Sequence, residues 1–225
     1  MVLNRMGHFV QYSYNKSTSF YPATAGQGET VSLVFDRQGK RKYLTPKERR
    51  QFLNAAAKSA SPEVGTFCCL LTHTGVRISE ALAIRPSQID KELGVIVVRS
   101  LKKRRSNVYR AVPVPPSLVT QLQIVHDIGR VRDGAQISDE PIWAWCRTTA
   151  WQRVKVVMRA ADIHGPQATP KGLRHGFAVA ALDAGVPLNI VQKWLGHARL
   201  HTTAIYADAV GEEERSIAQR MWQDL

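Results

Sequence analysis

Residues 170–197 read PKGLRHGFAVAALDAGVPLNIVQKWLGH, and this stretch decides how the chain is interpreted. Two basic residues, Lys171 and Arg174, lie three apart at the start of an apolar segment, where charged side chains are usually disfavoured. Gly185 is expected to end a first helix, and Gly196 to stand at the C-cap of a second. The stretch therefore predicts cations where two helices enter the protein core.

The composition limits the range of functions. The chain has 225 residues, 44% of them hydrophobic, which is enough for one substantial core. Its 31 Lys and Arg residues outnumber 18 Asp and Glu residues, which gives a formal net charge of +13 and a pI near 10.1. A globular protein this basic usually meets a polyanion, and nucleic acid is the commonest one.

The cysteines and the apolar segments indicate a cytoplasmic protein. Three cysteines without metal-ligand spacing argue against a disulfide framework and against a zinc site. Cys68 and Cys69 lie in an apolar run and are predicted to be core residues. We expect neither a signal peptide nor a membrane span, because no segment has about 20 consecutive apolar residues.

The pattern of the chain predicts a mainly α fold with a small antiparallel β-sheet (α+β). Residues 1–42 are expected to form an irregular arm with one short strand at 30–36. The first helix should begin at Thr45, with Pro46 in its first turn and Glu48 completing a capping box. Further helices are expected at residues 61–75, 76–84, 116–128 and 148–163, the last capped by Thr148 or Thr149, and strands at 94–100 and 109–115.

Two arginines at helix starts are candidate phosphate ligands. Arg77 follows the helix-breaking Gly75, and Arg174 is flanked by apolar residues. Arginine is seldom buried without an anionic partner, and its planar fork matches two phosphate oxygens. Glu80 could supply a structural partner for Arg77, so an ion pair and a phosphate clamp are both open from the residues alone.

The segment 99–110 holds six basic residues and no acidic one, and it is predicted to be a hairpin with a charged tip. The tip is either a solvated turn or a ribbon that reaches DNA. Lys102, at the end of the first strand, could present its ammonium as a proton donor. His197 and Tyr206 taken singly are more typical of a surface histidine and a packing aromatic.

The combination of these residues changes their interpretation. Their order and spacing resemble the tyrosine recombinase (phage integrase) family, through the stretches TGVRISEAL, VVRSLKKRR, GLRHGFA, WLGH and TTAIYA, over roughly residues 44–210. The six residues that match the catalytic set of this family are Arg77, Lys102, Lys171, Arg174, His197 and Tyr206.

The resemblance implies a mechanism without metal, ATP or other cofactor. Tyr206 would attack a DNA phosphodiester and form a 3′-phosphotyrosyl link. Arg77 and Arg174 would hold the non-bridging oxygens, and His197 would donate a hydrogen bond to one of them. Lys102 would protonate the leaving 5′ oxygen; Lys103 is the alternative, because the length of the hairpin is uncertain by one residue.

Lys171 departs from the family, whose usual box is His-x-Leu-Arg. A lysine is protonated near neutral pH, since its ordinary pKa is about 10.4, so it donates to a phosphate more readily than it accepts a proton. Type IB topoisomerases carry a lysine at this place. His175 lies about 100° round the helix from Arg174 and is not expected to replace the base. The general base for Tyr206 stays open.

The resemblance also implies an architecture and partners. Residues 1–42 would be an arm in place of a full core-binding domain, 43–210 the catalytic domain, and 211–225 a tail helix that docks on a neighbouring protomer. The partner would be double-stranded DNA, bound by a homo-tetramer on paired sites, with possible accessory proteins, in a nucleoid-associated setting. Further DNA contacts are predicted at Lys103, Arg104, Arg105, Arg110, Arg147, Arg153 and Lys155.

Three functions remain from the sequence. The first is site-specific recombination, in inversion, resolution or integration of a mobile element or plasmid. The second is non-catalytic DNA-binding regulation by the same fold, which Lys171 and the short amino-terminal side favour. The third is a type IB topoisomerase-like activity, which shares the lysine.

Overall fold

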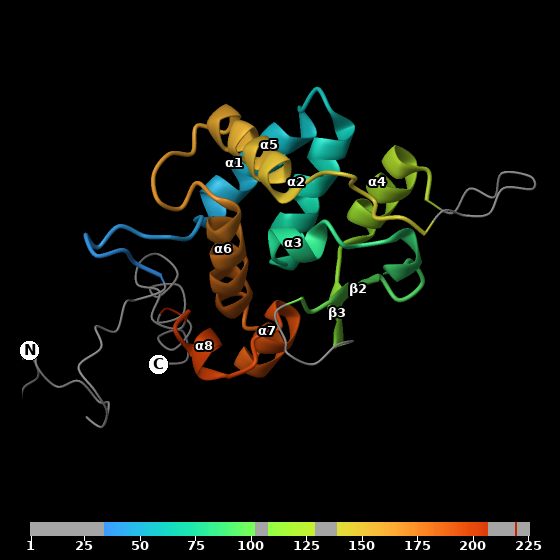
Figure 1. Ribbon diagram of the computed structural model, residues 1–225. Coiled ribbons are helices and arrows are strands. Elements are labelled where there is room, and N and C mark those ends of the chain that lie inside the picture. Colours follow the sequence, from blue (N-terminus) through green and yellow to red (C-terminus); the bar gives the residue numbers. More distant parts are fainter. Residues whose placement is uncertain (1–33, 102–107, 129–138, 207–218, 220–225) are drawn as a thin grey trace, which may run out of the picture. The chain divides into compact units, whose positions relative to one another are not determined.

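Helix α2 (Pro62–Thr74) lies at the centre of the helical part of the fold, with ten of its thirteen residues buried. The computed structural model describes residues 34–101, 108–128, 139–206 and 219, which belong to one compact unit of the chain. Helices α1 (Pro46–Ala57), α4 (Pro116–His126) and α6 (Pro170–Asp183) pack against α2 (Figure 1). Cys68 is fully buried and Cys69 is 9% exposed, so the prediction of core cysteines is confirmed.

The ends of the first two helices follow the local sequence signals. The Thr45 hydroxyl accepts a hydrogen bond from the Glu48 amide at 3.2 Å, and the Glu48 carboxylate accepts one from the Thr45 amide at 2.9 Å. This is the predicted capping box. Helix α2 ends at Gly75, whose φ of 60° lies in the left-handed region that glycine adopts without steric cost.

Helix α5 (Arg147–Ala160) begins earlier than predicted. Its N-cap is Cys146, and the Cys146 sulfur accepts a hydrogen bond from the Thr149 amide at 3.5 Å. The prediction of a cap at Thr148 or Thr149 is therefore wrong, because Cys146 is the residue with extended backbone before the helix and both threonines lie in its first turn. Threonine is a favoured N-cap residue and cysteine is not, so the sequence gave no indication that Cys146 would cap this helix.

The predicted hairpin is present as part of a three-stranded antiparallel sheet, β1 (Ile89–Asp90), β2 (Val95–Arg99) and β3 (Tyr109–Pro113), in that order. Val98 pairs with Arg110, and both side chains are buried on the face that points to α7 (Leu188–Leu195) and α3 (Ile78–Ala81). The hairpin tip at 102–107 lies outside the described residues. Of the strand expected at 30–36, the described part shows only a single bridge between Phe35 and Arg41.

A second cluster of buried residues joins α6 to the carboxyl-terminal helices. It contains Val34, Tyr43, Phe177, Val191, Leu195 and Tyr206. Tyr206 follows α8 (His201–Ala204), so this cluster places it against α6. Helices around one small sheet are the predicted fold class. None of the helices in the described residues is long and apolar enough to cross a bilayer.

Gly172 is a position at which a side chain does not fit. A Cβ there would stand 1.8 Å from the carbonyl oxygen of Gln167, which is backbone and cannot rotate away. We therefore expect Gly172→Ala to lower the free energy of unfolding by at least about 3 kcal/mol, the upper end of the usual cost of overpacking. Chemical denaturation measures this. The exposed neighbour serves as the control, since Lys171→Ala should change the same quantity by less than about 0.5 kcal/mol.

Candidate active site

Arg174 is a buried cation without a carboxylate partner among the described residues. Its side chain projects from the second turn of α6, where the residue is 6% exposed. One Nη donates to the carbonyl of Gly75 and the other to the carbonyl of Leu195, both at 2.8 Å. These carbonyls stand at the carboxyl ends of α2 and α7, which carry partial negative charge. Burial, with Arg77 adding repulsion, lowers the pKa of Arg174 to about 10, so the guanidinium stays charged at neutral pH.

Arg77 lies beside this cation on the strand-like link between α2 and α3. Its amide donates to one oxygen of Glu80 and its guanidinium to the other, each at 3.0 Å. The partner that the sequence offered for Arg77 is thus present. The Arg77 side chain is nevertheless 28% exposed, so it can turn donors toward a ligand while Glu80 holds it.

Glu80 is the carboxylate that positions the cations. Its side chain has no exposed surface, and it also accepts a hydrogen bond from Arg110 at 2.7 Å. Burial alone would raise the pKa of Glu80, but the hydrogen bonds and charges of Arg110 and Arg77 hold it below its ordinary value. A carboxylate that faces two guanidinium groups stays ionised and fixes both of them.

Arg110 is held inside the protein. The residue is 7% exposed, and its donors reach Glu80, the carbonyl of Trp194 at 2.7 Å and the hydroxyl of Ser100 at 3.1 Å. These contacts enclose the guanidinium of Arg110, so its predicted contact with DNA, which stays a prediction, would require the side chain to leave Glu80. Alternate residues of a strand face opposite sides of the sheet, and Arg110 lies on the buried side. The run of basic residues in the sequence gave no sign of this.

His197 follows the left-handed Gly196 that ends α7, at φ 66°, and is fixed by that turn. Its Nδ1 pairs with the hydroxyl of Thr203 at 2.9 Å, and its ring stacks on Tyr206 with centroids 6.2 Å apart and planes 18° apart. Burial, with repulsion from Arg174 and Arg77, lowers the pKa of His197 to about 3. The imidazole is therefore neutral at pH 7.

Tyr206 is enclosed beside these groups, at 3% exposure. Its hydroxyl lies 2.8 Å from Nδ1 of His175. Burial raises the pKa of Tyr206, although Arg174 and Arg77 act in the opposite direction. His175 was not expected to act as the base, because it lies about 100° round α6 from Arg174, yet the segment after α8 brings the Tyr206 hydroxyl to its side of the helix. Sequence spacing does not fix that approach.

Arg77, Arg174, His197 and Tyr206 are thus brought together from four separate segments of the chain. Residues 42–213 match the phage integrase family. The chain belongs to this family. The resemblance seen in the motifs and the predicted fold class are both confirmed.

Several relatives show how far the likeness extends. Tyrosine recombinase XerA of Thermococcus kodakarensis is 27% identical over 192 residues, which cover 80% of this chain and 62% of XerA. A crystal structure of XerA recombinase has a TM-score of 0.66 at 25% identity, covering 80% of this chain and 64% of that one. The XerH site-specific recombinase bound to its difH substrate has a TM-score of 0.60 at 22% identity, covering 84% and 59%. The chain therefore spans about three fifths of the length of its relatives.

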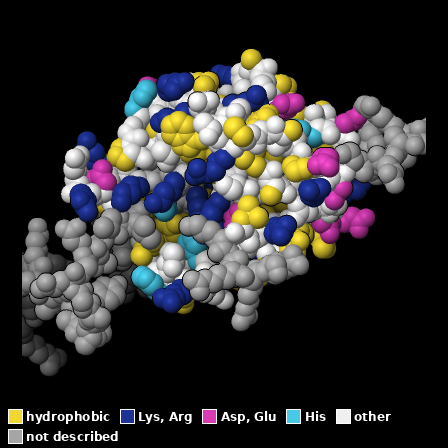
Figure 2. Space-filling view, viewed as in Figure 1, with side chains coloured by type: hydrophobic (Ala, Val, Ile, Leu, Met, Phe, Trp, Pro, Cys, Tyr) yellow, Lys and Arg dark blue, Asp and Glu magenta, His cyan; other side chains and the backbone are white. Residues whose placement is uncertain are grey.

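The remaining predicted site residues are divided between the surface and the segments outside the description. Lys171 is exposed at the start of α6. Arg147 is exposed, Arg153 lies 3.9 Å over the ring of Trp145, and Lys155 donates to the carbonyl of Ala168. The predicted residues Lys102, Lys103, Arg104 and Arg105 lie outside the described residues. One face of this integrase-family domain carries a band of Lys and Arg side chains with histidine beside it (Figure 2).

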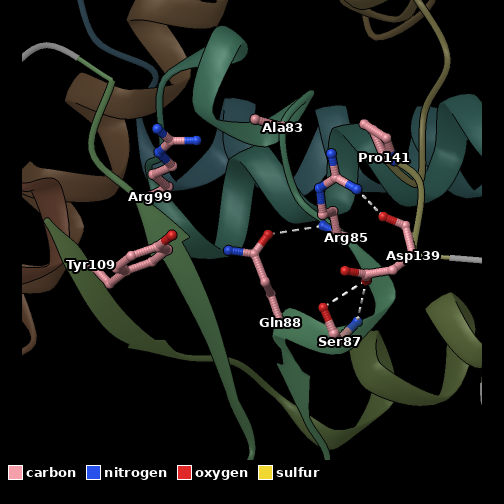
Figure 3. A pocket seen from close by; sticks show the side chains of 8 residues that line it. All are labelled: Ala83, Arg85, Ser87, Gln88, Arg99, Tyr109, Asp139 and Pro141. Atoms are coloured by element: carbon pink, nitrogen blue, oxygen red, sulfur yellow. Dashed lines mark hydrogen bonds between the residues drawn. The ribbon is translucent and has the colours of Figure 1, made fainter. Parts of the chain in front are cut away.

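A separate recess of about 300 Å³ is lined by η1 (Pro86–Gln88), the strands β2 and β3, and the segment around Asp139 (Figure 3). Arg99 and Tyr109 lie opposite each other on the two strands and line one side. Ser87 donates to the Asp139 carboxylate at 2.6 Å on the other side. None of the five predicted catalytic residues in the described part of the chain lines this recess, and no sequence motif pointed to it.

The Glu80 network gives a stability prediction. Glu80→Gln removes the charge that compensates buried Arg110, so the free energy of unfolding should fall by about 3–5 kcal/mol, as when one partner of a buried pair is lost. Urea denaturation measures it. Asp139→Asn, at an exposed carboxylate with hydrogen bonds of its own, should unfold at the wild-type urea concentration. Equal midpoints for Glu80→Gln and the wild type would contradict the role given to Glu80.

The buried histidines predict an acid limb of stability. Burial, with Lys171 and Arg174 repelling a proton, lowers the pKa of His175 from 6.5 to about 3. Between these values the unfolded chain binds a proton that the folded chain excludes, so stability is full above pH 6.5 and falls as the pH drops toward 3. His175→Gln should flatten the loss by up to about 1.4 kcal/mol per pH unit. Thermal unfolding across pH 4–7 tests this, with exposed His164→Gln expected to follow the wild type.

Proposed function

We propose that this chain is a site-specific DNA recombinase that cleaves and rejoins strands through a 3′-phosphotyrosyl intermediate on Tyr206. The observation that carries the proposal is the buried guanidinium of Arg174, which has only carbonyl partners in the described part of the chain and stands next to Arg77, His197 and the tyrosine. Glu80 acts favourably on the charge of Arg174 from nearby, but no carboxylate in the described part of the chain contacts the guanidinium directly, so an anion can still bind there. A DNA phosphodiester is the anion that a protein of charge +13 meets most readily.

The residues divide the reaction between them. Arg174 and Arg77 bind the non-bridging phosphate oxygens and stabilise the charge that grows as phosphorus becomes five-coordinate. The Tyr206 oxygen forms the new bond to phosphorus, the bond to the 5′ oxygen breaks, and the energy of the diester is kept in the protein–DNA link. His197 donates to a phosphate oxygen through its free ring nitrogen. Lys102 delivers the proton to the departing 5′ oxygen.

The assembly that we propose is a homo-tetramer on two DNA sites, assisted by accessory proteins in some settings. The basic band in Figure 2 supports a DNA-facing surface. The relatives named tyrosine recombinases support recombination as the activity. Residues 1–42 would add DNA contacts and 211–225 would dock on a neighbouring protomer. Inversion, resolution and integration of a mobile element or plasmid are the roles that such an activity serves.

A second candidate is a DNA-binding regulator that does not cleave. The burial of Tyr206 at 3% and its raised pKa favour this candidate, because a neutral, enclosed phenol is a poor nucleophile. Both candidates predict DNA binding. Only the recombinase predicts a covalent bond between Tyr206 and a DNA phosphate.

A trapping experiment distinguishes them. The protein first selects its binding site from fragments of the DNA that flanks its gene. Duplexes with this site are then synthesised with a nick beside each scissile position. Cleavage releases a short strand, so the covalent adduct cannot religate and is trapped. The wild type should form a covalent complex that resists denaturing electrophoresis. Tyr206→Phe should bind the same duplex with unchanged affinity and form none. If the wild type binds the duplex but forms no adduct, the recombinase proposal is wrong and the non-cleaving regulator is supported.

Arg174→Lys supplies a graded control in the same assay. A lysine retains the positive charge but loses the fork that joins two carbonyls and two phosphate oxygens. We expect DNA binding within a few fold of the wild type and a cleavage rate reduced by roughly 100-fold or more, as is usual when a preorganised donor of charge stabilisation is lost.

A further inference from the structure

The contact between His175 and Tyr206 is not explained by the roles assigned so far. His175 follows Arg174 on α6 and is 4% exposed. Its Nδ1 lies 2.8 Å from the Tyr206 hydroxyl, and the two rings are 5.4 Å apart. Its other nitrogen, Nε2, is buried and has no hydrogen-bond partner within the described residues. A buried polar atom without a partner is uncommon in native proteins, so this histidine calls for an explanation.

The other groups near the tyrosine are poorly suited to take its proton. Lys171 is exposed at the start of α6, and an ammonium group is a donor without an acceptor atom. His197 uses its Nδ1 on Thr203 and stacks on the tyrosine ring, which does not bring it into line with the hydroxyl. Arg174 and Arg77 are donors only. A neutral imidazole with Nδ1 facing the hydroxyl can accept the proton.

We propose that His175 is the general base of this recombinase and receives the phenolic proton of Tyr206 during strand cleavage. The proposal rests on the proposed function and assigns the role that Lys171 leaves open. As the Tyr206 oxygen bonds to phosphorus, its proton moves to Nδ1 of His175, while the 5′ oxygen leaves with a proton from a separate acid. The His175 tautomer that this requires carries its hydrogen on Nε2. Religation runs the same transfers in reverse.

The charges around His175 explain how it is neutral before reaction and able to accept a proton during it. Lys171, Arg174, Lys42 and His197 are the groups that act on its charge, from α6, the segment before α1 and the end of α7, and all of them disfavour an imidazolium. In free protein His175 therefore stays unprotonated. A bound phosphodiester brings a negative charge against Arg174 and its neighbours. That charge offsets the repulsion at the moment when the proton is transferred.

Single-turnover cleavage of the nicked duplex as a function of pH tests the proposal. His175→Asn keeps a hydrogen-bonding group near the Nδ1 position but cannot accept a proton, and His175→Gln is a second variant in case the first is unstable. Both should cleave roughly 100- to 10,000-fold more slowly than the wild type at pH 7. Their rates should then rise about tenfold per pH unit as Tyr206 loses its proton to solvent, while the wild-type rate stays flat from pH 7 to 9.

Controls separate this role from packing and from the leaving-group acid. His164→Gln, an exposed histidine outside the site, should match the wild-type rate and pH profile. A duplex with sulfur in place of the bridging 5′ oxygen needs no acid, so it should rescue Lys102→Ala and leave the two His175 variants slow. Rescue of the His175 variants by this duplex would overturn the proposal, as would a pH profile parallel to that of the wild type.

The wild type also gives a test that needs no substitution at His175. Nitrogen-15 chemical shifts of the His175 ring should show that Nε2 carries the proton and Nδ1 carries none in the free protein. A proton found on Nδ1 would overturn the proposal.

Failure of this inference can be distinguished from failure of the proposed function. If the wild type forms an adduct that Tyr206→Phe does not, and the His175 variants cleave at the wild-type rate, recombination stands and His175 is not the base.

Discussion

The two hydrogen bonds of the Arg174 guanidinium determine most of the site. One ties α6 to the end of α2 at Gly75, and the other ties it to the end of α7 at Leu195. A rigid fork can satisfy both carbonyls only when the three helices hold one relative position. The same fork, enclosed by the helix ends, keeps a positive charge in a region of low exposure. Arg174 therefore fixes the helix arrangement and, under the proposed function, would also bind the phosphate.

Glu80 complements this arrangement from the other side of the site. As a buried carboxylate it neutralises Arg110, which is enclosed, and orients Arg77, which is partly exposed. The carboxylate is thus shared between two guanidinium groups, and Arg174 has none of its own among the described residues. A substrate phosphate would supply the missing negative charge, so binding and charge balance favour each other.

The enclosure of Tyr206 adds a further constraint. Tyr206 is packed in a cluster with Val191, Leu195 and Phe177, and its hydroxyl faces His175. Burial makes the phenol reluctant to ionise, and cations make the imidazole reluctant to take a proton. Under the proposed function, a phosphate bound beside Arg174 would make both ionisations easier. Tyr206 would then be reactive only when DNA is bound.

The sequence by itself determined the family, the fold class and the residue types of the site. The capping box at Thr45 and the left-handed glycines at 75 and 196 are local signals, and each is found where it was expected. Caps and turns depend on neighbouring residues, so a single sequence encodes them directly.

The tertiary structure alone decided which side chains face one another. The contact of His175 with Tyr206 and the enclosure of Arg110 were not evident from the spacing of the residues. Both depend on how the segment after α8 lies against α6 and on which face of the sheet meets α7. Those placements result from packing between elements that are distant in sequence. Helix geometry fixes the direction of a side chain on its own helix, but not the neighbour that it meets.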